Sequence, residues 1–130
     1  MPLRENIVPP HWRPFFEATG IPAAVRVGAE VTVSGHTGET AEGFSADAAV
    51  QFRTTLLMIS ETLAEGGLTW SDVTEIQSFH VDLRAQSAWI VDIAREFMDP
   101  PLPAWTALGV AEFFEPGALV EVSCRAVAPN

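Results

Sequence analysis

The sequence contains no lysine and no tyrosine, and its seven basic residues other than histidine are all arginines. Without a lysine side chain the protein cannot form the Schiff base that a pyridoxal phosphate enzyme or a lysine-dependent aldolase requires. It also lacks the lysine that contacts phosphates in a P-loop. These enzyme classes are therefore excluded, and we expect a protein that works without a cofactor.

Cysteine is nearly absent as well. Cys124 is the single cysteine, so neither an intramolecular disulfide nor a cysteine-rich zinc site can form. The three histidines, His11, His36 and His80, do not pair with nearby acidic residues at the spacing of a zinc motif. We therefore predict no metal site, and we expect Cys124 to be a buried, unreactive thiol in an apolar strand.

Long apolar runs and clustered positive charge are also missing. The sequence has no run of about 18 apolar residues, which excludes a membrane-spanning helix, and its start lacks the apolar core of a signal peptide. The net charge is −10 and the arginines are scattered, whereas nucleic acids and anionic membranes attract clustered cations. We expect a cytoplasmic protein with neither nucleic acid nor membrane as a partner.

The apolar residues that are present suffice for one core. The 130 residues, 48% of them hydrophobic, fit a single domain that spans the whole chain. Residues 1–22 hold several prolines and are expected to be irregular, apart from a short helix over 11–19 that ends at Gly20. Alternating valines then predict a β-hairpin over 24–34 that turns at Gly28.

The clearest predicted helix has Ser45 as its expected N-cap and ends at Gly66-Gly67. Between these points, apolar residues recur with 3-4-3-4 spacing and form one stripe, made up of Ala49, Phe52, Leu56, Ile59 and Leu63. Further along, the pattern predicts a strand over 75–83, a second helix over 86–98 and two closing strands over 105–110 and 119–127.

The predicted order ββαβαββ describes an α+β domain in which two helices cover one face of a mixed sheet. The other face has no cover, and we expect Val33, Val120 and Val122 to make that face apolar. A second copy of the chain is its natural cover, because exposed apolar patches usually mark interfaces. His80 is expected to lie on this face and to form hydrogen bonds at the interface.

Five motifs occur in an order that is typical of one family. They are Val33-Ser34-Gly35, Gly67-Leu68-Thr69-Trp70-Ser71-Asp72-Val73, Asp82-Leu83, Pro100-Pro101-Leu102-Pro103-Ala104 and the closing Gly117-Ala118-Leu119-Val120-Glu121-Val122. Over roughly residues 20–127 the sequence thereby resembles the RidA (YjgF-type) family of reactive-imine deaminases.

This resemblance implies a chorismate-mutase-like fold that assembles as a homotrimer, with the uncovered sheet faces forming a central barrel and three clefts between subunits. In the deaminases of the family, these clefts hydrolyse imines and enamines that pyridoxal phosphate enzymes release. A glutamate on the last strand helps to place the attacking water, and an arginine after the Pro-Ala step binds the substrate carboxylate. The glutamate position is Glu121 in this sequence.

Two family positions differ here. The arginine position is Trp105, whose indole has one N–H and a large apolar face in place of a bidentate guanidinium. The family's N-terminal tyrosine falls at about Ile21. The carboxylate clamp is therefore missing, and Trp105 favours a more apolar or aromatic substrate, unless it is only a packing residue. Arg26 or Arg84 is a candidate to replace this arginine. The alternative for both is that they are solvated surface residues.

The remaining candidates surround the Ser-Gly motif. His36 either donates to a ligand or shuttles protons near neutral pH, or it is an exposed turn residue. Ser34 lacks the sequence context of a nucleophile and is expected to secure the loop. Glu121 alternates with two valines, which also suits a solvated residue, but at a cleft its carboxylate would act as a general base toward water.

We therefore predict Glu121 as the catalytic residue, with Trp105, His36, Ser34 and Ile21 binding the substrate. The first hypothesis is a cofactor-free hydrolase that deaminates a reactive imine or enamine in the cleft between subunits. The alternative is a homotrimer that binds a small metabolite without turnover, and the sequence alone leaves open which of the two applies. The acidic charge and the lack of lysine argue against ribonuclease, an activity sometimes attached to the family.

Overall fold

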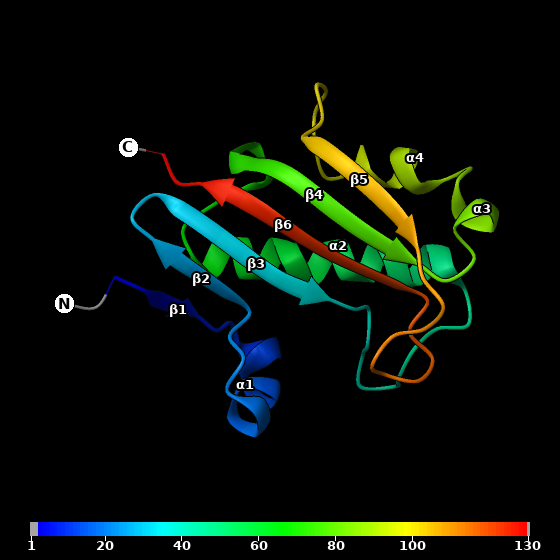
Figure 1. Cartoon of the computed structure of the whole chain (residues 1–130), viewed down its shortest axis with the longest axis horizontal. Helices are drawn as coiled ribbons and strands as arrows, with labels where there is room; N and C mark the ends of the chain where they lie inside the picture. The colour runs from blue at the N-terminus through cyan, green and yellow to red at the C-terminus, as the bar shows by residue number, and fades with distance from the viewer. Residues whose placement is uncertain (1–2, 130) are drawn as a thin grey trace.

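A mixed sheet of six strands, counted over residues 3–129, forms one layer of the fold (Figure 1). The structure is a computed structural model and describes residues 3–129. Neighbouring strands are antiparallel except β4 and β5, which are parallel. In the order in which they lie across the sheet, the strands are β1 (Glu5–Ile7), β2 (Ala24–Val27), β3 (Glu30–His36), β6 (Val120–Val127), β4 (Val73–His80) and β5 (Ala104–Gly109).

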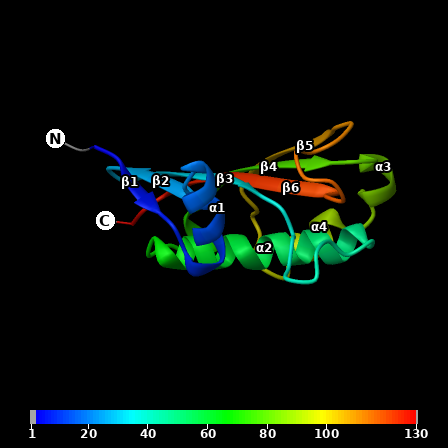
Figure 2. The ribbon, with the colours of Figure 1, turned by 90° about the horizontal axis from the view of Figure 1, so that it is seen from below.

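Helices form the second layer. α2 and α4 pack on one face of the sheet, and no helix within residues 3–129 covers the opposite face (Figure 2). The predicted class, a single α+β domain with a mixed sheet and helices on one face, is therefore confirmed. In chain order the helical elements are η1 (Pro10–Trp12), α1 (Arg13–Thr19), α2 (Ala48–Glu65), η2 (Trp70–Asp72), α3 (Leu83–Gln86) and α4 (Ile90–Ala94).

The long helix α2 supplies most of the apolar contact with the sheet. Its predicted stripe is confirmed, since Phe52, Leu56, Ile59 and Leu63 are all buried. The N-cap is Asp47 rather than the predicted Ser45, because the Asp47 side chain accepts a hydrogen bond from the Ala49 backbone N–H. No helix among residues 3–129 is both long and apolar enough to cross a membrane.

The second predicted helix, over 86–98, is wrong in its bounds: beyond Gln86 only Ile90–Ala94 within it is helical, as α4, and the separate short helix α3 (Leu83–Gln86) ends where the predicted helix was expected to begin. The Gln86 side chain is buried against β4, and Trp89 adopts non-helical backbone angles while its ring lies 5.8 Å from that of Phe52. These two tertiary contacts turn the chain between α3 and α4, which explains why helical periodicity alone did not reveal the break.

The N-terminal segment is more regular than expected. Residues 5–7 form the edge strand β1, which pairs with β2 in the register Asn6 opposite Val25, so the prediction of an irregular segment over 1–22 is wrong for this stretch. Residues 1–2 lie outside the described part. The predicted helix over 11–19 is present as η1 followed by α1, and it ends as predicted at Gly20, whose φ of 79° is left-handed.

The distribution of residues between the two sheet faces corrects one expectation. Val33, Val120 and Val122 are at most 2% exposed and lie beneath α2, rather than on the uncovered face. The residues that alternate with them on β6, including Glu121 and Arg125, point to the uncovered face. That face carries polar side chains together with a few exposed apolar ones, such as Val127, and the buried valines give no argument for self-association.

Candidate functional site

A pocket of about 490 Å³ opens beside the end of β3, between α1 and the loop that connects β5 to β6. It brings together four of the five predicted site residues, Glu121, His36, Ser34 and Ile21. Trp105 does not line this pocket. Its volume is in the range that holds a small organic molecule.

Glu121 reaches the pocket from β6 by crossing over Gly35 of β3. The β3–β6 register shifts between Val33 and His36, and this irregularity places Gly35 next to the carboxylate. A Cβ atom at position 35 would lie 2.6 Å from Glu121 Oε2. Glycine in the Ser-Gly motif thus leaves the space that the Glu121 side chain occupies.

Three carboxylates give the pocket an acidic character. Burial raises the pKa of Glu121, and the nearby Glu115 raises it further. Burial also raises the pKa of Glu115, with a further contribution from Glu39. All three acids line the pocket, and its lining residues within the described chain include no arginine. A carboxylate whose pKa is raised exchanges protons closer to neutral pH, as a general acid or base must.

Aromatic side chains also line the pocket. The ring centroid of Trp12 lies 4.5 Å from that of His36 and 5.1 Å from that of Phe15. The Trp12 indole N–H donates a hydrogen bond to the Ile21 carbonyl oxygen at 2.8 Å. Ile21 therefore contributes its backbone to the wall, while Trp12 supplies the aromatic surface near the position where the family carries a tyrosine.

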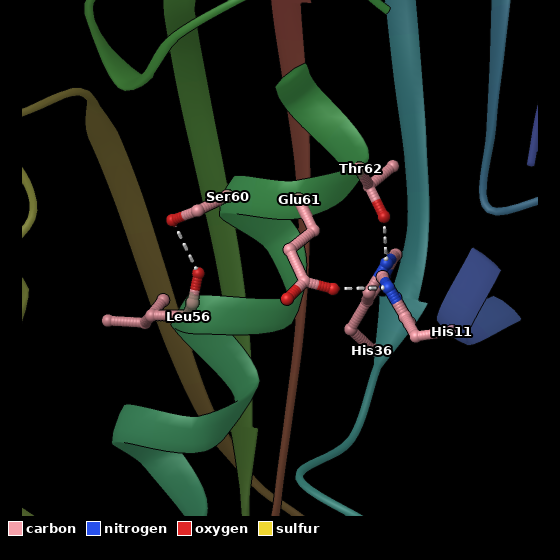
Figure 3. A network of polar contacts seen from close by, with 6 residues as sticks. All are labelled: His11, His36, Leu56, Ser60, Glu61 and Thr62. Carbon is pink, nitrogen blue, oxygen red and sulfur yellow. Dashed lines mark hydrogen bonds and ion pairs between the residues drawn. The ribbon is translucent and has the colours of Figure 1, made fainter. Parts of the chain in front are cut away.

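His36 is buried, and both of its ring nitrogens form hydrogen bonds. It is 1% exposed, and its Nδ1 lies 2.7 Å from the Ser34 carbonyl oxygen. Its Nε2 lies 2.8 Å from Thr62 Oγ1 (Figure 3). Because a carbonyl only accepts, Nδ1 carries the proton and Nε2 accepts from the Thr62 hydroxyl. Burial lowers the pKa of His36 to about 4. His36 is thus neutral near pH 7, and its burial shows that the prediction of an exposed turn residue is wrong.

His11, which is partly buried, lies beside His36. Its Nδ1 lies 2.8 Å from Glu61 Oε2 on α2, and its ring centroid lies 5.9 Å from that of His36 (Figure 3). The sequence patterns gave no reason to place either His11 or Trp12 at the site. The missing signal is tertiary, because η1 and α1 fold back against α2 and β3.

Gln51 holds the loop that closes the other side of the pocket. This buried α2 side chain donates from Nε2 to the Gly117 carbonyl oxygen at 2.9 Å and accepts at Oε1 from the Leu119 N–H at 2.8 Å. The loop between β5 and β6 carries Phe114, which is 97% exposed, and Glu115. One buried amide therefore fixes the pocket wall to the helix.

Trp105 lies on the helix-covered face of the sheet. Its ring is stacked on that of Phe52, with an angle of 11° between the planes and 6.4 Å between the centroids. Its indole N–H donates to Ser78 Oγ at 2.8 Å. Within one chain, therefore, Trp105 packs against the core and is separated from Glu121.

His80 accompanies Trp105 on this face, which corrects its predicted place on the uncovered face. It is fully buried, with Nε2 2.8 Å from Ser78 Oγ and Nδ1 2.7 Å from Gln86 Oε1. An amide oxygen only accepts, so Nδ1 carries the proton and the Ser78 hydroxyl donates to Nε2. Burial lowers the pKa of His80.

Local contacts show where the remaining predicted residues lie. Ser34 Oγ donates to the Pro22 carbonyl oxygen at 2.8 Å, so its loop-securing role is confirmed. Cys124 is 4% exposed, and burial raises its thiol pKa to about 12, as expected for an unreactive thiol. Neither Arg26 nor Arg84 lines the pocket. Among residues 3–129, no three His, Cys, Asp or Glu residues are grouped closely enough to hold a metal ion.

Comparison with known proteins supplies independent findings. The model of the family described as Endoribonuclease L-PSP matches residues 18–128. The RutC family protein YjgH of Escherichia coli (strain K12) is 38% identical over 90 residues, which are 68% of this chain and 69% of that protein. The solved structure of protein YjgH has a TM-score of 0.87 at 30% identity and covers 99% of both chains.

Two further solved structures share the fold. Rv2704 of Mycobacterium tuberculosis, a member of the YjgF/YER057c/UK114 family, has a TM-score of 0.81 at 27% identity, over 96% of this chain and 99% of that one. TdcF of E. coli with bound serine has a TM-score of 0.76 at 23% identity, over 84% of this chain and 88% of that one.

Proposed function

Because this chain belongs to the RidA (YjgF-type) family, whose model is described as Endoribonuclease L-PSP, we propose that it is a cofactor-free hydrolase that deaminates a reactive imine or enamine metabolite. The observation that carries the proposal is the place of Glu121, a partly buried carboxylate with a raised pKa in a pocket of small-molecule size. The bound serine in TdcF supports a small ligand for this fold.

The proposed reaction converts a protonated imine and water into a carbonyl compound and ammonium. The ionised Glu121 carboxylate takes a proton from water while the water oxygen bonds to the imine carbon, and the π electrons of the C=N bond move to nitrogen. The product of this step is a carbinolamine. The Glu121 carboxylic acid then returns its proton to the carbinolamine nitrogen, which makes nitrogen a leaving group.

Collapse of the carbinolamine completes the cycle. Glu121 takes the hydroxyl proton as the C=O bond forms and the C–N bond breaks. The released ammonia accepts that proton from Glu121, so ammonium leaves and the carboxylate is restored. An acid whose pKa is raised by burial suits these repeated proton transfers better than one at the ordinary value.

We also propose that the pocket is completed in a homotrimer. The face opposite α2 carries no helix in the described residues (Figure 2), and the family resemblance places intersubunit clefts at this face. A neighbouring subunit would cover Glu121 and the exposed Phe114, and it would bring the partly exposed edge of its own Trp105 to the cleft. Exclusion of water around Glu121 would strengthen its electrostatic contacts.

Binding without turnover is the second candidate function, and the lack of an arginine in the pocket favours it. Loss of a charge-assisted contact to a carboxylate typically costs about 2–5 kcal/mol, which corresponds to a rate loss on the order of 10²–10³ for a small imino acid. Ribonuclease activity is not proposed, because the net charge of −10 disfavours RNA binding.

The test is hydrolysis of imines generated in place by an oxidase, with semicarbazide competing for the free imine. We expect accelerated loss of bulky or aromatic imines and a loss of that acceleration in Glu121→Gln. Glu30→Gln is the matched control, because Glu30 is an exposed acid at the opposite end of β3. Hydrolysis that is unchanged in Glu121→Gln would refute the role of Glu121. Ligand binding without any product would favour the binding function.

A further inference from the structure

Building on the proposed function, we infer that this pocket selects its substrate by positive charge: it takes protonated imines derived from amines without a carboxylate, bearing an apolar or aromatic substituent. This substrate class differs from the 2-imino acids for which the family's arginine serves as a clamp. Three features of the pocket support the inference.

The first feature is the balance of charge. Glu39, Glu115 and Glu121 all line the pocket, while its described lining residues include no arginine. His11 also lines the pocket, but its Nδ1 lies 2.8 Å from the carboxylate of a fourth acid, Glu61. The carboxylates repel one another, and this repulsion contributes to their raised pKa values: Glu115 raises the pKa of Glu121, and Glu39 raises the pKa of Glu115. A bound cation relieves this repulsion. A substrate carboxylate in the same place adds to it, and like charges in one site cost free energy.

The second feature is that the buried His36 adds no positive charge to the pocket. The Ser34 carbonyl holds the His36 proton on Nδ1, and Nε2 accepts from Thr62. Protonation of Nε2 would place a full positive charge in a buried cluster, and this burial is the main cause of the lowered pKa of His36. His36 thus presents a neutral ring to the pocket.

The third feature is the aromatic surface. Trp12, Phe15 and Phe114 line the same cavity as the three carboxylates. Cations bind over the faces of aromatic rings, most strongly over tryptophan. The same rings bury an apolar substituent. Carboxylates and aromatic faces together match a flat cation with an apolar group, which is the form of a protonated aromatic or alkyl imine.

Binding of three isosteric probes tests the inference without requiring turnover. Benzamidinium is a stable cation that resembles a protonated aromatic imine, benzamide is its neutral counterpart, and benzoate is its anionic counterpart. Titration followed by tryptophan fluorescence and by NMR of the wild-type protein is expected to give benzamidinium a dissociation constant at least about tenfold lower than that of benzamide. Benzoate is expected to bind more weakly than benzamide.

Variants assign the binding to this pocket. Glu115→Gln is expected to weaken benzamidinium several-fold and to leave benzamide nearly unchanged, because it removes charge and keeps shape. Trp12→Leu is expected to weaken both probes. Glu30→Gln, remote from the pocket, is expected to change neither. Circular dichroism and gel filtration of each variant confirm that it is folded before its affinities are compared.

The outcomes separate this inference from the proposed function. Equal or tighter binding of benzoate overturns the inference, as does the absence of benzamidinium binding. Hydrolysis of imino acids in preference to amine-derived imines also overturns it, while the hydrolase proposal stands. Selective benzamidinium binding with no hydrolysis of any imine supports cation selection by the pocket and refutes the hydrolase.

Discussion

The Glu121 carboxylate lies over the α carbon of Gly35, so closely that a Cβ at position 35 would meet Oε2 at 2.6 Å. The obstructing atom is the end of a flexible side chain, so Gly35→Ala is expected to displace the carboxylate rather than unfold the sheet. We predict a stability loss of no more than about 1–2 kcal/mol and a loss of imine hydrolysis on the order of 10-fold to 100-fold. Steady-state kinetics and chemical denaturation measure both.

A double mutant gives the control for this prediction. Glu121→Ala removes the obstructing atoms, so Gly35→Ala is expected to cost less stability in the Glu121→Ala background than in the wild type. Additive stability effects would show that Gly35 and Glu121 do not contact each other in the folded protein.

The buried His36 predicts how stability depends on pH. Its pKa falls from an ordinary 6.5 to about 4 on folding, so between these values the unfolded chain binds a proton that the folded chain does not. The free energy of unfolding therefore decreases as the pH falls from about 6.5 toward 4. At about 1.4 kcal/mol for each pH unit, this contribution reaches about 3 kcal/mol.

Denaturation of the wild type and of His36→Gln between pH 7 and pH 4.5 tests this assignment. The wild type is expected to lose stability more steeply as the pH falls, because only it carries the His36 titration. His80 contributes in the same direction, and Glu115 and Glu121 in the opposite one, but all three are present in both proteins. Parallel curves would contradict the assignment.

Ser78 joins two buried groups, and its removal is expected to be costly. Its hydroxyl oxygen accepts from the Trp105 indole and its proton goes to His80 Nε2. Ser78→Ala leaves both partners unsatisfied, so we predict a loss of about 2–3 kcal/mol in the free energy of unfolding. Ser87→Ala, at an exposed residue just after α3 whose hydroxyl donates to the Arg84 carbonyl oxygen, is the control and is expected to change stability by less than about 0.5 kcal/mol.

Sedimentation equilibrium tests the proposed assembly. We expect a mass three times that of the 14.0 kDa chain. A mass equal to that of one chain would refute the homotrimer. It would also refute the proposal that a neighbouring subunit contributes its Trp105 to the cleft.

Local patterns in the sequence were sufficient for the parts of the fold that depend on local spacing. The 3-4-3-4 stripe from Ala49 to Leu63 predicted the buried face of α2, and Gly20 marked the end of α1. Alternation showed that Val120 and Val122 share one face of β6. It could not show which face α2 covers, because that depends on how the crossover connections pack.

The candidate site was predictable only where a motif recorded it. Glu121, Ser34 and His36 were found from motif positions, but the state of His36 depends on Thr62, a partner 26 residues away on α2. Trp12 and Phe114 line the pocket because η1 and the loop between β5 and β6 fold toward β3. A single sequence carries no local signal for such contacts.

Gln51 anchors one part of the loop between β5 and β6, and a different part of the same loop lines the pocket. The amide fixes the loop near Gly117 and Leu119, whereas the side chains at positions 114 and 115 line the pocket. Substitutions at these two positions can therefore change which molecules enter without loosening the anchor. Specificity can diverge among descendants of this fold while the scaffold is inherited unchanged.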